Sequence, residues 1–328
     1  MDEQRKKKLR RLYFKTLAIT LAVCIGLMGV GWGVFVYMVG GLNRLDIDEN
    51  KLSAGESIDG IVNIALYGVD SDAGQFSGRS DAIMICSVNG KTGKIKLISI
   101  ARDTYVSVPG YYNTKINHAY AYGGPELAVQ TLNENFDMDI TDYVTVNFDS
   151  LADIIDEMGG VTIDVTEAER QQINAYLRRG KPLQEIGMVN LTGAEAVSYS
   201  RIRKIDSDTM RASRQREVLS ALFDKALDIN PLNYPSYVRK FSPMVETSLS
   251  NDEILKMATV ALKNPTLEQA AFPNDYIQSG GQTIDGTWYY VYDLEQATDM
   301  LQQYIYEDIP FEHYGLTEEE IAALDETE

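Results

Sequence analysis

The feature that most constrains this chain is an apolar segment near its N-terminus. Residues 16–38 read TLAITLAVCIGLMGVGWGVFVYM and carry no charge. A helix of that length reaches roughly 35 Å at about 1.5 Å per residue, enough to cross a hydrocarbon core of about 30 Å. A cleaved signal peptide is the rival interpretation, but its apolar region is normally only about 7–15 residues long. We therefore predict an uncleaved transmembrane anchor at residues 16–39.

Basic residues before this segment predict its orientation. Seven precede it, and they are Arg5, Lys6, Lys7, Lys8, Arg10, Arg11 and Lys15. Such residues are retained on the cytoplasmic side of a span. Residues 1–15 should therefore form a cytoplasmic tail, and the rest of the chain should lie outside the cell membrane. The spacing of Gly29 and Gly33 suits the packing of two spans, so a weak dimer through the anchor is an alternative to a lone helix.

Composition excludes several classes of protein. The chain has 30 basic and 48 acidic residues and a net charge of -18. A general nucleic-acid binder would carry a basic surface, so we expect no nucleic-acid partner. Two cysteines, Cys24 and Cys86, cannot form a disulfide framework. Two histidines, His118 and His313, make a zinc site or a Ser-His-Asp triad a poor expectation.

A single α/β domain is expected after a short linker. Residues 40–60 are polar and indicate a linker, residues 61–307 carry the periodic pattern, and residues 308–328 form an acidic tail. The pattern predicts strands at 63–69, 82–88, 95–101, 143–148, 161–165 and 287–292, and helices at 208–228, 252–263 and 294–306. This mixed order favours a three-layer α/β/α domain with a mixed, partly antiparallel central sheet.

Charged residues follow the ends of the first predicted strands. If those three strands form an up-down-up meander, one edge of the sheet collects Asp70, Asp81, Arg102 and Asp103. Such an edge is a favoured place for a functional site, because a rigid scaffold positions the loops there. Asp and Gly are also common in ordinary turns. This segment alone is therefore compatible with a site and with a solvated strand edge.

Arginines cluster in a second segment, on and before the predicted helix at 208–228. Counting back from Leu219 in steps of four places Gln215 and Arg211 on the buried face of that helix. Three more arginines lie nearby in the sequence: Arg201, Arg203 and Arg214. Their guanidinium groups need anionic partners, which are either local acidic side chains or a bidentately bound phosphate.

The two segments together are compatible with one kind of chemistry. Two carboxylates can hold a Mg²⁺ ion that also contacts substrate phosphates. Several arginines can neutralise the remaining charge of a diphosphate. A site of this kind lowers the barrier to displacement at phosphorus without histidine or cysteine.

Seven motifs at these positions resemble, in order, those of the LytR-CpsA-Psr family of bacterial cell-envelope proteins. They are NIALYGVD (63–70), GRSDAIMI (78–85), ISIARDTYVSVPG (98–110), KINHAYAYGG (115–124), MGGVTIDV (158–165), LTGAEAVSYSRIRK (191–204) and DTMRASRQREVL (208–219). The resemblance implies an enzyme at the outer face of the membrane. It would take a teichoic-acid-like or capsular glycopolymer from a polyprenyl-pyrophosphate carrier and join it to peptidoglycan through a phosphodiester bond.

The resemblance also implies roles for individual residues. Asp70 and Asp81 would hold Mg²⁺, with Mn²⁺ as an alternative. The pyrophosphate would be bound by Arg79, Arg102, Lys115, Arg201, Arg203, Arg211, Arg214 and Gln215. The catalytic group would be Asp81, Arg102 and Asp103, with either carboxylate as the base or as a ligand. His118 is expected to be structural rather than a proton-transfer group.

Two positions depart from the family pattern. Asp72 stands where the family usually has arginine, so one phosphate contact is lost or replaced. Ala101 stands where proline commonly precedes the Arg-Asp pair, while Arg102 itself is kept. Two alternatives to polymer transfer remain. With water as acceptor the same residues would make a pyrophosphatase, and without turnover they would make a polyprenyl-phosphate receptor.

Overall fold

The computed structural model describes residues 40–71, 75–230, 233–261, 263, 265–317 and 321. The predicted cytoplasmic tail, the predicted anchor and Asp72 lie outside these residues. Within the described part of the chain, no helix is long and apolar enough to cross a bilayer. The anchor and its orientation therefore stay predictions.

The chain divides into two compact units. Of the described residues, the smaller unit comprises 40–42, 230 and 233–243, and the larger comprises 43–71, 75–229, 244–261, 263, 265–317 and 321. Within the smaller unit, α7 (Tyr234–Phe241) packs the ring of Tyr237 against that of Phe241, with 5.6 Å between the ring centroids. All the residues of the candidate site belong to the larger unit.

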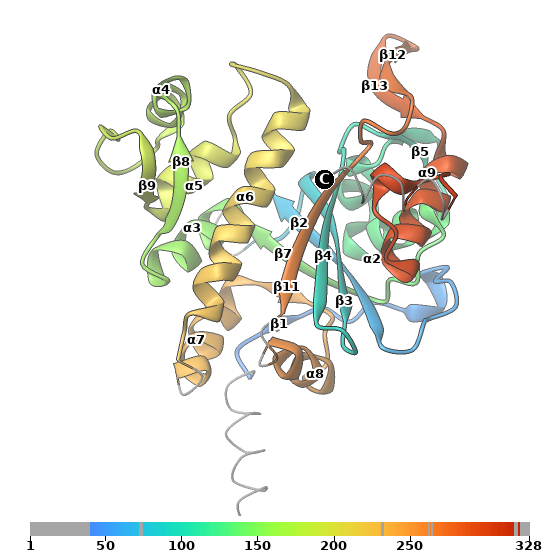
Figure 1. Cartoon of the computed structure of the whole chain (residues 1–328), viewed down its shortest axis with the longest axis horizontal. Helices are drawn as coiled ribbons and strands as arrows, with labels where there is room; N and C mark the ends of the chain where they lie inside the picture. Colours follow the sequence, from blue (N-terminus) through green and yellow to red (C-terminus); the bar gives the residue numbers. More distant parts are fainter. Residues whose placement is uncertain are drawn as a thin grey trace, which may run out of the picture. The chain divides into compact units, whose positions relative to one another are not determined.

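A seven-stranded mixed sheet forms the centre of the larger unit (Figure 1). In spatial order its strands are β1 (Asn43–Arg44), β10 (Glu246–Thr247), β7 (Asp142–Asn147), β2 (Ile61–Val69), β3 (Ser80–Asn89), β4 (Lys94–Ile100) and β11 (Thr266–Phe272). β2, β3 and β4 are antiparallel neighbours, so the predicted meander is confirmed. β7 pairs with β2 in parallel, and β11 pairs with β4 in parallel. The predicted mixed α/β fold is confirmed as well.

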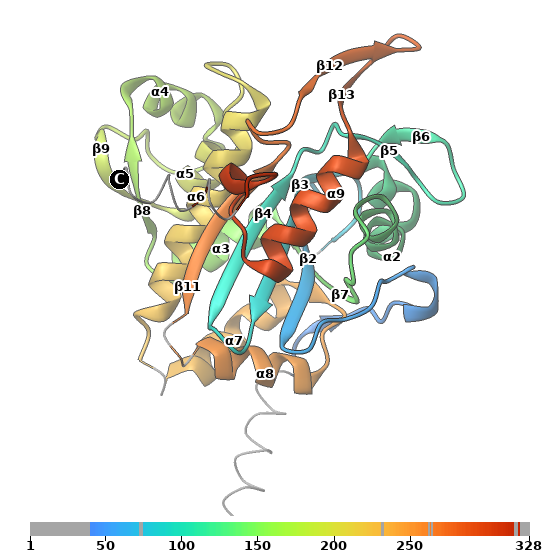
Figure 2. The ribbon, with the colours of Figure 1, turned by 45° about the vertical axis from the view of Figure 1, so that its right-hand side comes forward.

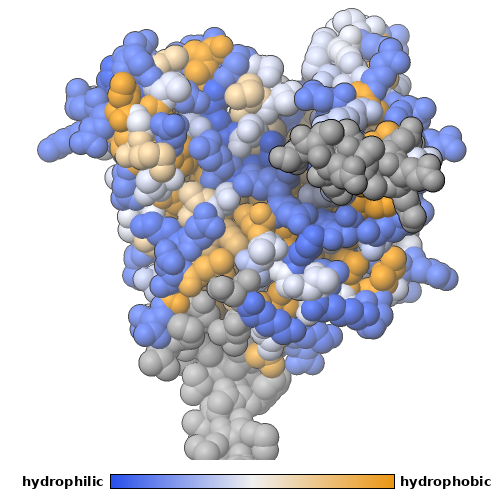
Figure 3. Space-filling model, in the orientation of Figure 1, coloured by the Kyte–Doolittle hydropathy of each residue, from blue (hydrophilic) through white to orange (hydrophobic). Residues whose placement is uncertain are grey.

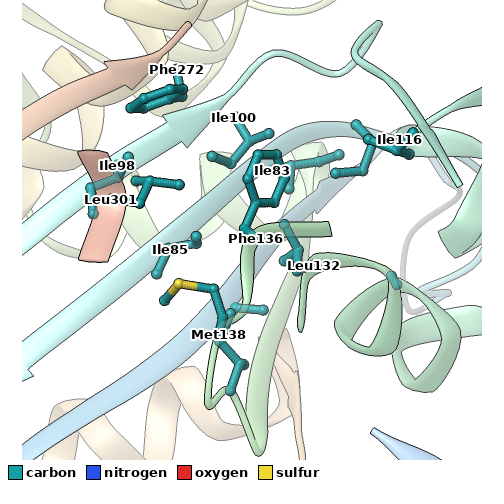
Figure 4. Packing of buried hydrophobic residues seen from close by; sticks show 14 of the residues in the cluster. Ile83, Ile85, Ile98, Ile100, Ile116, Leu132, Phe136, Met138, Phe272 and Leu301 are labelled. Carbon is teal, nitrogen blue, oxygen red and sulfur yellow. The ribbon is translucent and has the colours of Figure 1, made fainter. Parts of the chain in front are cut away.

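One face of this sheet is covered by α2 (Asn117–Phe136) and α9 (Leu294–Gln302). Side chains alternate across a strand, so every second residue of β3 and β4 enters this core. Figure 4 shows that isoleucines of these two strands pack beside residues of α2, the methionine that follows α2 and a leucine of α9. These residues are Ile83, Ile85, Ile98, Ile100, Leu132, Phe136, Met138 and Leu301. Each is at most 3% exposed, so this packing holds the strand ends in fixed positions.

The other face carries α3 (Phe148–Glu157), α5 (Gly193–Ser200) and α6 (Asp208–Leu227). Beyond them lies a two-stranded sheet of β8 (Val161–Val165) and β9 (Gly187–Leu191), next to α4 (Glu167–Tyr176). These elements have their own hydrophobic core, which includes Ile163, Ile173 and Leu191. The predicted strand at 161–165 therefore exists, but it pairs with β9 and does not join the central sheet.

Two hairpins extend from the site end of the central sheet (Figure 2). β5 (Tyr105–Ser107) pairs with β6 (Asn113–Lys115), and β12 (Ser279–Ile284) pairs with β13 (Thr287–Tyr292). A bridge between Thr104 and Tyr290 joins the two hairpins. α8 (Asn251–Ala261) lies at the opposite end of the sheet (Figure 2).

Residues at both predicted domain boundaries take part in packing. Leu52, in the predicted linker, is fully buried, and the Nδ2 of Asn133 donates to its carbonyl at 2.9 Å. Asp308, in the predicted tail, accepts from Lys96 at 2.5 Å, and Phe311 joins the core under α9. The polar composition of these segments did not indicate such contacts, because each depends on a single side chain.

Candidate functional site

A β-bulge positions Asp81 at one edge of the central sheet. Gly68 pairs with Ala82, but Val69 pairs with Ser80, so Asp81 is the extra residue of β3. A bulge re-aims a side chain that regular alternation would direct elsewhere. Asp81 consequently lines the same cavity as its neighbour Ala82.

The turn after β4 presents Arg102 and Asp103. Thr104 closes this turn, since its N–H and its hydroxyl both donate to the carbonyl of Ala101, at 3.0 and 2.6 Å. The carbonyl of Asp103 in turn accepts from the N–H of Tyr290 at 2.9 Å. Arg102 and Asp103 therefore lie on a turn whose backbone is held by hydrogen bonds from Thr104 and from Tyr290.

Five side chains from four segments form a network of alternating charges. Nη1 of Arg102 lies 2.5 Å from Oδ1 of Asp81, and Nε of Arg102 lies 3.4 Å from Oδ2 of Asp103. Nζ of Lys115 lies 2.7 Å from Oδ1 of Asp103, and Nη2 of Arg203 lies 3.6 Å from Oδ2 of Asp81. Apart from Arg203, these side chains are only 12–22% exposed. Salt therefore screens these pairs less than it screens pairs on an open surface.

Asp70, at the end of β2, faces a different arginine. Nη2 of Arg201 lies 3.2 Å from Oδ2 of Asp70. The guanidinium carbon of Arg201 lies 4.7 Å from the centre of the Phe148 ring, a cation–π contact that orients the side chain. The structure thus brings both predicted metal ligands next to arginines that the sequence predicted for phosphate binding.

The N-terminal end of α6 forms another wall. Ser207 caps this helix, and its hydroxyl accepts from the N–H of Met210 at 3.3 Å. Arg211 and Gln215 follow on the inner side and are 3% and 9% exposed. The first N–H groups of a helix have no partner within the helix and attract anions. This wall therefore favours negative charge.

These elements enclose a cavity of about 240 Å³. We call it the polar cavity after its charged side chains, although apolar atoms make up most of its lining. Its charged and amide-bearing lining consists of Asp81, Arg102, Asp103, Arg211 and Gln215. In Figure 3 hydrophilic side chains, drawn blue, cover much of the surface between the α4–β8–β9 lobe and the hairpin of β12 and β13. The network places two arginines and one lysine next to two carboxylates. This arrangement makes the cavity suitable for an anion with a bound cation.

An apolar groove of about 160 Å³ adjoins the polar cavity. Ala82 and Gln215 line both spaces, so the groove begins where the charged lining ends. Its walls come from β2, β3, β7, α3 and α6 and include Leu66, Met84, Val144, Val146, Phe148, Leu151, Val218 and Leu219. The two spaces together suit a ligand with a charged head and a hydrocarbon tail.

Arg79 and His118 lie at the margin of the network. Arg79 is exposed and follows Gly78, whose φ of 101° is one that glycine adopts without strain. Burial lowers the pKa of His118, and the positive charges of Arg79 and Lys115 lower it further. Nδ1 of His118 lies 2.9 Å from the Thr114 hydroxyl. A neutral imidazole held in this way is compatible with the predicted structural role.

Arg214 does not line the polar cavity. Its Nε lies 2.9 Å from Oε1 of Glu169, and its Nη1 lies 3.1 Å from Oδ1 of Asp206. Burial opposes the charged form of Glu169, yet hydrogen bonds from Arg214 and Thr166 hold its pKa below the ordinary value. Only 4% of the Arg214 side chain is exposed. Two carboxylates already pair with Arg214. We therefore assign this arginine to the contact between α4 and α6 and not to ligand binding.

Several cavity residues were not named from the sequence. Trp288 and Tyr290, on β13, line the polar cavity together with Phe272, the last residue of β11, and Pro273 after it. They come from the last quarter of the chain, whereas the last of the seven motifs ends at residue 219. The aromatic run TWYYVY at 287–292 was a local signal for Trp288 and Tyr290.

Asp70 and Asp81 suit a small divalent cation by their chemistry. Mg²⁺ prefers carboxylate oxygens and is commonly held by one or two of them together with water and substrate phosphates. Among the described residues, no group of three or more His, Cys, Asp or Glu side chains could hold a metal ion. The two aspartates therefore fit a Mg²⁺ or Mn²⁺ ion bound jointly with a diphosphate, and not a site made by protein ligands alone.

An α/β domain with an arginine-lined cavity beside an apolar groove defines a class of proteins that bind amphipathic anions. Comparison with known proteins gives the particular family. The chain belongs to the LytR_cpsA_psr family, whose family model matches residues 43–305. The resemblance seen in the seven motifs is thereby confirmed.

Relatives with curated names and solved structures agree with this assignment. The polyisoprenyl-teichoic acid–peptidoglycan teichoic acid transferase TagU of Bacillus cereus (strain AH820) is 33% identical over 285 residues, which cover 81% of this chain and 89% of the relative. The structure described as TagT bound to LIIa-WTA has a TM-score of 0.66 and 27% identity, and the match covers 79% of this chain and 98% of that one. The structure described as YwtF (TagT) with bound octaprenyl pyrophosphate lipid has a TM-score of 0.62 and 26% identity over the same shares.

Proposed function

We propose that this protein transfers a glycopolymer from a polyprenyl-pyrophosphate carrier to peptidoglycan and forms a phosphodiester bond. One observation carries the proposal: the arginine-lined polar cavity and the apolar groove meet at Ala82 and Gln215. A polyprenyl pyrophosphate has the matching distribution of charge and hydrocarbon. The similar proteins named as teichoic acid transferases, and the similar structure with octaprenyl pyrophosphate, support the same substrate class.

The arginines would bind and orient the diphosphate. Arg102 and Arg203 reach Asp81 from two sides, and Arg211 and Gln215 line the cavity opposite the β3 edge. Arginine offers paired N–H donors that match two phosphate oxygens, so binding and orientation come from the same contacts. Arg201, Arg79 and Lys115 would extend this positive rim. The first part of the polyprenyl chain would lie in the apolar groove.

The reaction would be an in-line displacement at phosphorus. An oxygen–phosphorus bond forms between the acceptor hydroxyl of peptidoglycan and the phosphorus that carries the polymer. The bond from that phosphorus to the bridging oxygen breaks, and polyprenyl phosphate leaves with the electron pair. The hydroxyl proton passes to a carboxylate, either Asp81 or Asp103. Arg102 contacts both carboxylates and would stabilise the charge that develops on the phosphoryl oxygens.

Asp70 and Asp81 would hold the divalent cation. Bound Mg²⁺ or Mn²⁺ would neutralise charge on the diphosphate oxygens. Both carboxylates contact arginines in this structure, so the residues that would bind the cation and those that would bind phosphate are already within contact distance.

The proposed location follows from the same chemistry. A membrane-embedded carrier and a wall polymer meet at the outer surface of the membrane, where the predicted anchor at residues 16–39 would hold the domain. The partners would be the lipid-linked glycopolymer, peptidoglycan and the membrane. The acidity of the chain, with a net charge of -18, disfavours nucleic acid.

A labelled lipid-linked donor tests the proposal. The full chain in lipid nanodiscs would be incubated with donor and Mg²⁺, with and without soluble peptidoglycan strands. Transfer predicts label on the strands and release of polyprenyl phosphate only when both substrates are present. Release of polyprenyl phosphate without strands would instead establish a pyrophosphatase. Donor binding without any product would establish a receptor, and either result would overturn the proposal.

A further inference from the structure

Exposed and half-buried aromatic side chains gather on the two hairpins and on α2, and those on β13 line the polar cavity. Tyr111 and Tyr112, between β5 and β6, are 53% and 64% exposed, and Trp288 on β13 is 47% exposed. Tyr122 on α2 and Tyr290 on β13 complete the group. We call these five residues the aromatic surface. Such exposure of large rings is costly in water and marks a binding surface when the rings are contiguous with a site.

Contacts among the rings hold the aromatic surface in place. Tyr111 stacks on Tyr122 with 4.7 Å between centroids and 25° between planes, and the hydroxyls of Tyr112 and Tyr122 lie 3.0 Å apart. Trp288 stacks on Tyr290 with 6.0 Å between centroids and 16° between planes. The rings are thus oriented before any ligand binds, which lowers the entropy cost of binding.

A glycine makes room for the indole. A Cβ added at Gly281, on the neighbouring strand β12, would lie 2.4 Å from Nε1 of Trp288. The indole therefore packs against the backbone of β12 and still stays 47% exposed. A second contact joins the hairpins, because Tyr105 and Tyr289 pack edge to face with 4.8 Å between centroids.

The part of the aromatic surface on β13 is continuous with the reacting residues. Trp288 and Tyr290 line the polar cavity with Asp81 and Asp103, yet neither lines the apolar groove. Nζ of Lys115 bridges the two regions, since it lies 2.7 Å from Asp103 and 5.8 Å from the Trp288 ring centre.

We propose that the aromatic surface binds the sugar rings of the acceptor glycan strand. This inference rests on the proposed function, because in-line displacement places the attacking and leaving oxygens on opposite sides of the phosphorus. The leaving polyprenyl phosphate belongs to the groove that meets the cavity at Ala82 and Gln215. The acceptor must then enter on the side that the groove does not occupy, and Trp288 and Tyr290 line that side.

The chemistry of these residues matches a pyranose better than it matches a lipid or a protein core. The C–H face of a sugar stacks on the electron-rich face of an aromatic ring, and the rim of the sugar offers hydroxyls. Tyrosine hydroxyls and the indole N–H can pair with such hydroxyls. All five residues of the surface are Tyr or Trp, and none is aliphatic.

Tryptophan fluorescence provides a direct test. The chain has two tryptophans, so Trp32→Phe leaves Trp288 as the reporter. The full chain in nanodiscs would be titrated with a soluble tetrasaccharide of alternating N-acetylglucosamine and N-acetylmuramic acid, without donor. We expect a saturable change in Trp288 emission. The double variant Tyr111→Ala/Tyr112→Ala should weaken tetrasaccharide binding at least fivefold, and donor binding should not change.

Tyr276 provides a matched control, because it is 53% exposed, as Tyr111 is, but lies outside the aromatic surface. Tyr276→Ala should bind the tetrasaccharide as the parent does. No saturable signal, equal losses in both variants, or a loss of donor binding instead of glycan binding would each overturn the inference. Since this titration needs no turnover, saturable glycan binding in a protein that transfers no polymer would reject the proposed function alone.

Discussion

Nη1 of Arg102 lies 2.5 Å from Oδ1 of Asp81, although the two residues are 21 positions apart and belong to different strand ends. The bulge in β3 turns Asp81 toward the cavity, and the closed turn after β4 brings Arg102 to meet it. This pair joins the proposed cation-binding and phosphate-binding halves of the site.

Asp81→Asn should reduce polymer transfer at least 100-fold while the domain stays folded. The amide keeps the size of the side chain and can still accept from Arg102, but it removes the negative charge that a base or a cation ligand needs. The labelled-donor assay at several Mg²⁺ concentrations measures the loss, and thermal unfolding checks the fold. Transfer at the parental rate would remove Asp81 from the proposed metal and catalytic groups.

Arg203→Ala should weaken donor binding about tenfold, because a hydrogen bond to a charged group contributes about 1.5–3 kcal/mol and this side chain is 44% exposed. Arg179→Ala is the matched control. Arg179 is also exposed and pairs with a carboxylate, that of Asp153 at 3.0 Å, but it does not line the polar cavity. Titration of nanodisc-bound protein with the lipid diphosphate gives both affinities. Equal affinities for the two variants would exclude Arg203 from the pyrophosphate site.

Arg214→Met should lower the free energy of unfolding by about 3–5 kcal/mol, the usual cost of removing one partner from a buried ion pair. Glu169 and Asp206 would be left without their shared cation. Chemical denaturation measures this loss. Undiminished stability together with lost donor binding would show instead that Arg214 belongs to the pyrophosphate site.

Gly193→Ala should destabilise the fold by about 3 kcal/mol or more, because a Cβ at this position would lie 1.9 Å from the carbonyl oxygen of Ala152. The first turn of α5 packs directly on α3 there, and the N–H of Gly193 donates to Asp156 at 2.6 Å. Gly280→Ala is the control, since nothing lies within 4 Å of a Cβ at that glycine. Similar unfolding midpoints for the two variants would contradict the proposed close packing.

The pH dependence of stability should include a contribution from His118. Burial and the charges of Arg79 and Lys115 lower its pKa, whereas Asp103 acts in the opposite direction. The unfolded chain therefore binds a proton at His118 before the folded chain does. Stability from this group is fully present above the ordinary pKa of about 6.5 and is lost as the pH falls through the lower folded value.

His118→Asn isolates that contribution. The difference in unfolding free energy between the parent and this variant should shrink from pH 7.5 to pH 5.5, as measured by denaturant titration at each pH. A difference that grows on acidification would mean that the folded protein favours the protonated imidazole, contrary to the expected sign.

Local patterns predicted much of the fold for identifiable reasons. The apolar runs that became β2, β3 and β4 are continuous because the inner strands of a covered sheet are buried on both faces. The four-residue spacing of Leu219, Gln215 and Arg211 predicted that the inner side of α6 turns polar toward its N-terminus, and Arg211 and Gln215 are buried there. Periodicity is local, so a sequence displays it directly.

Other features depend on partners that are distant in the chain. The sequence could not show that β8 would pair with β9 in a separate sheet, or that Glu169 and Asp206 would occupy Arg214. In the sequence, an arginine near a predicted site gives the same signal whether its anionic partner is a ligand or a carboxylate of another helix. Only the packing of α4 against α6 decides between them.

The amino-acid order alone determined the family, the central meander and the chemical types of the charged side chains, because each is written in contiguous residues. Tertiary structure decided which of those side chains share a cavity and which form internal ion pairs. It also brought Trp288 and Tyr290, from a late hairpin, to Asp81 and Asp103. Proximity across a fold arises from how whole elements pack, and no single stretch of sequence contains that information.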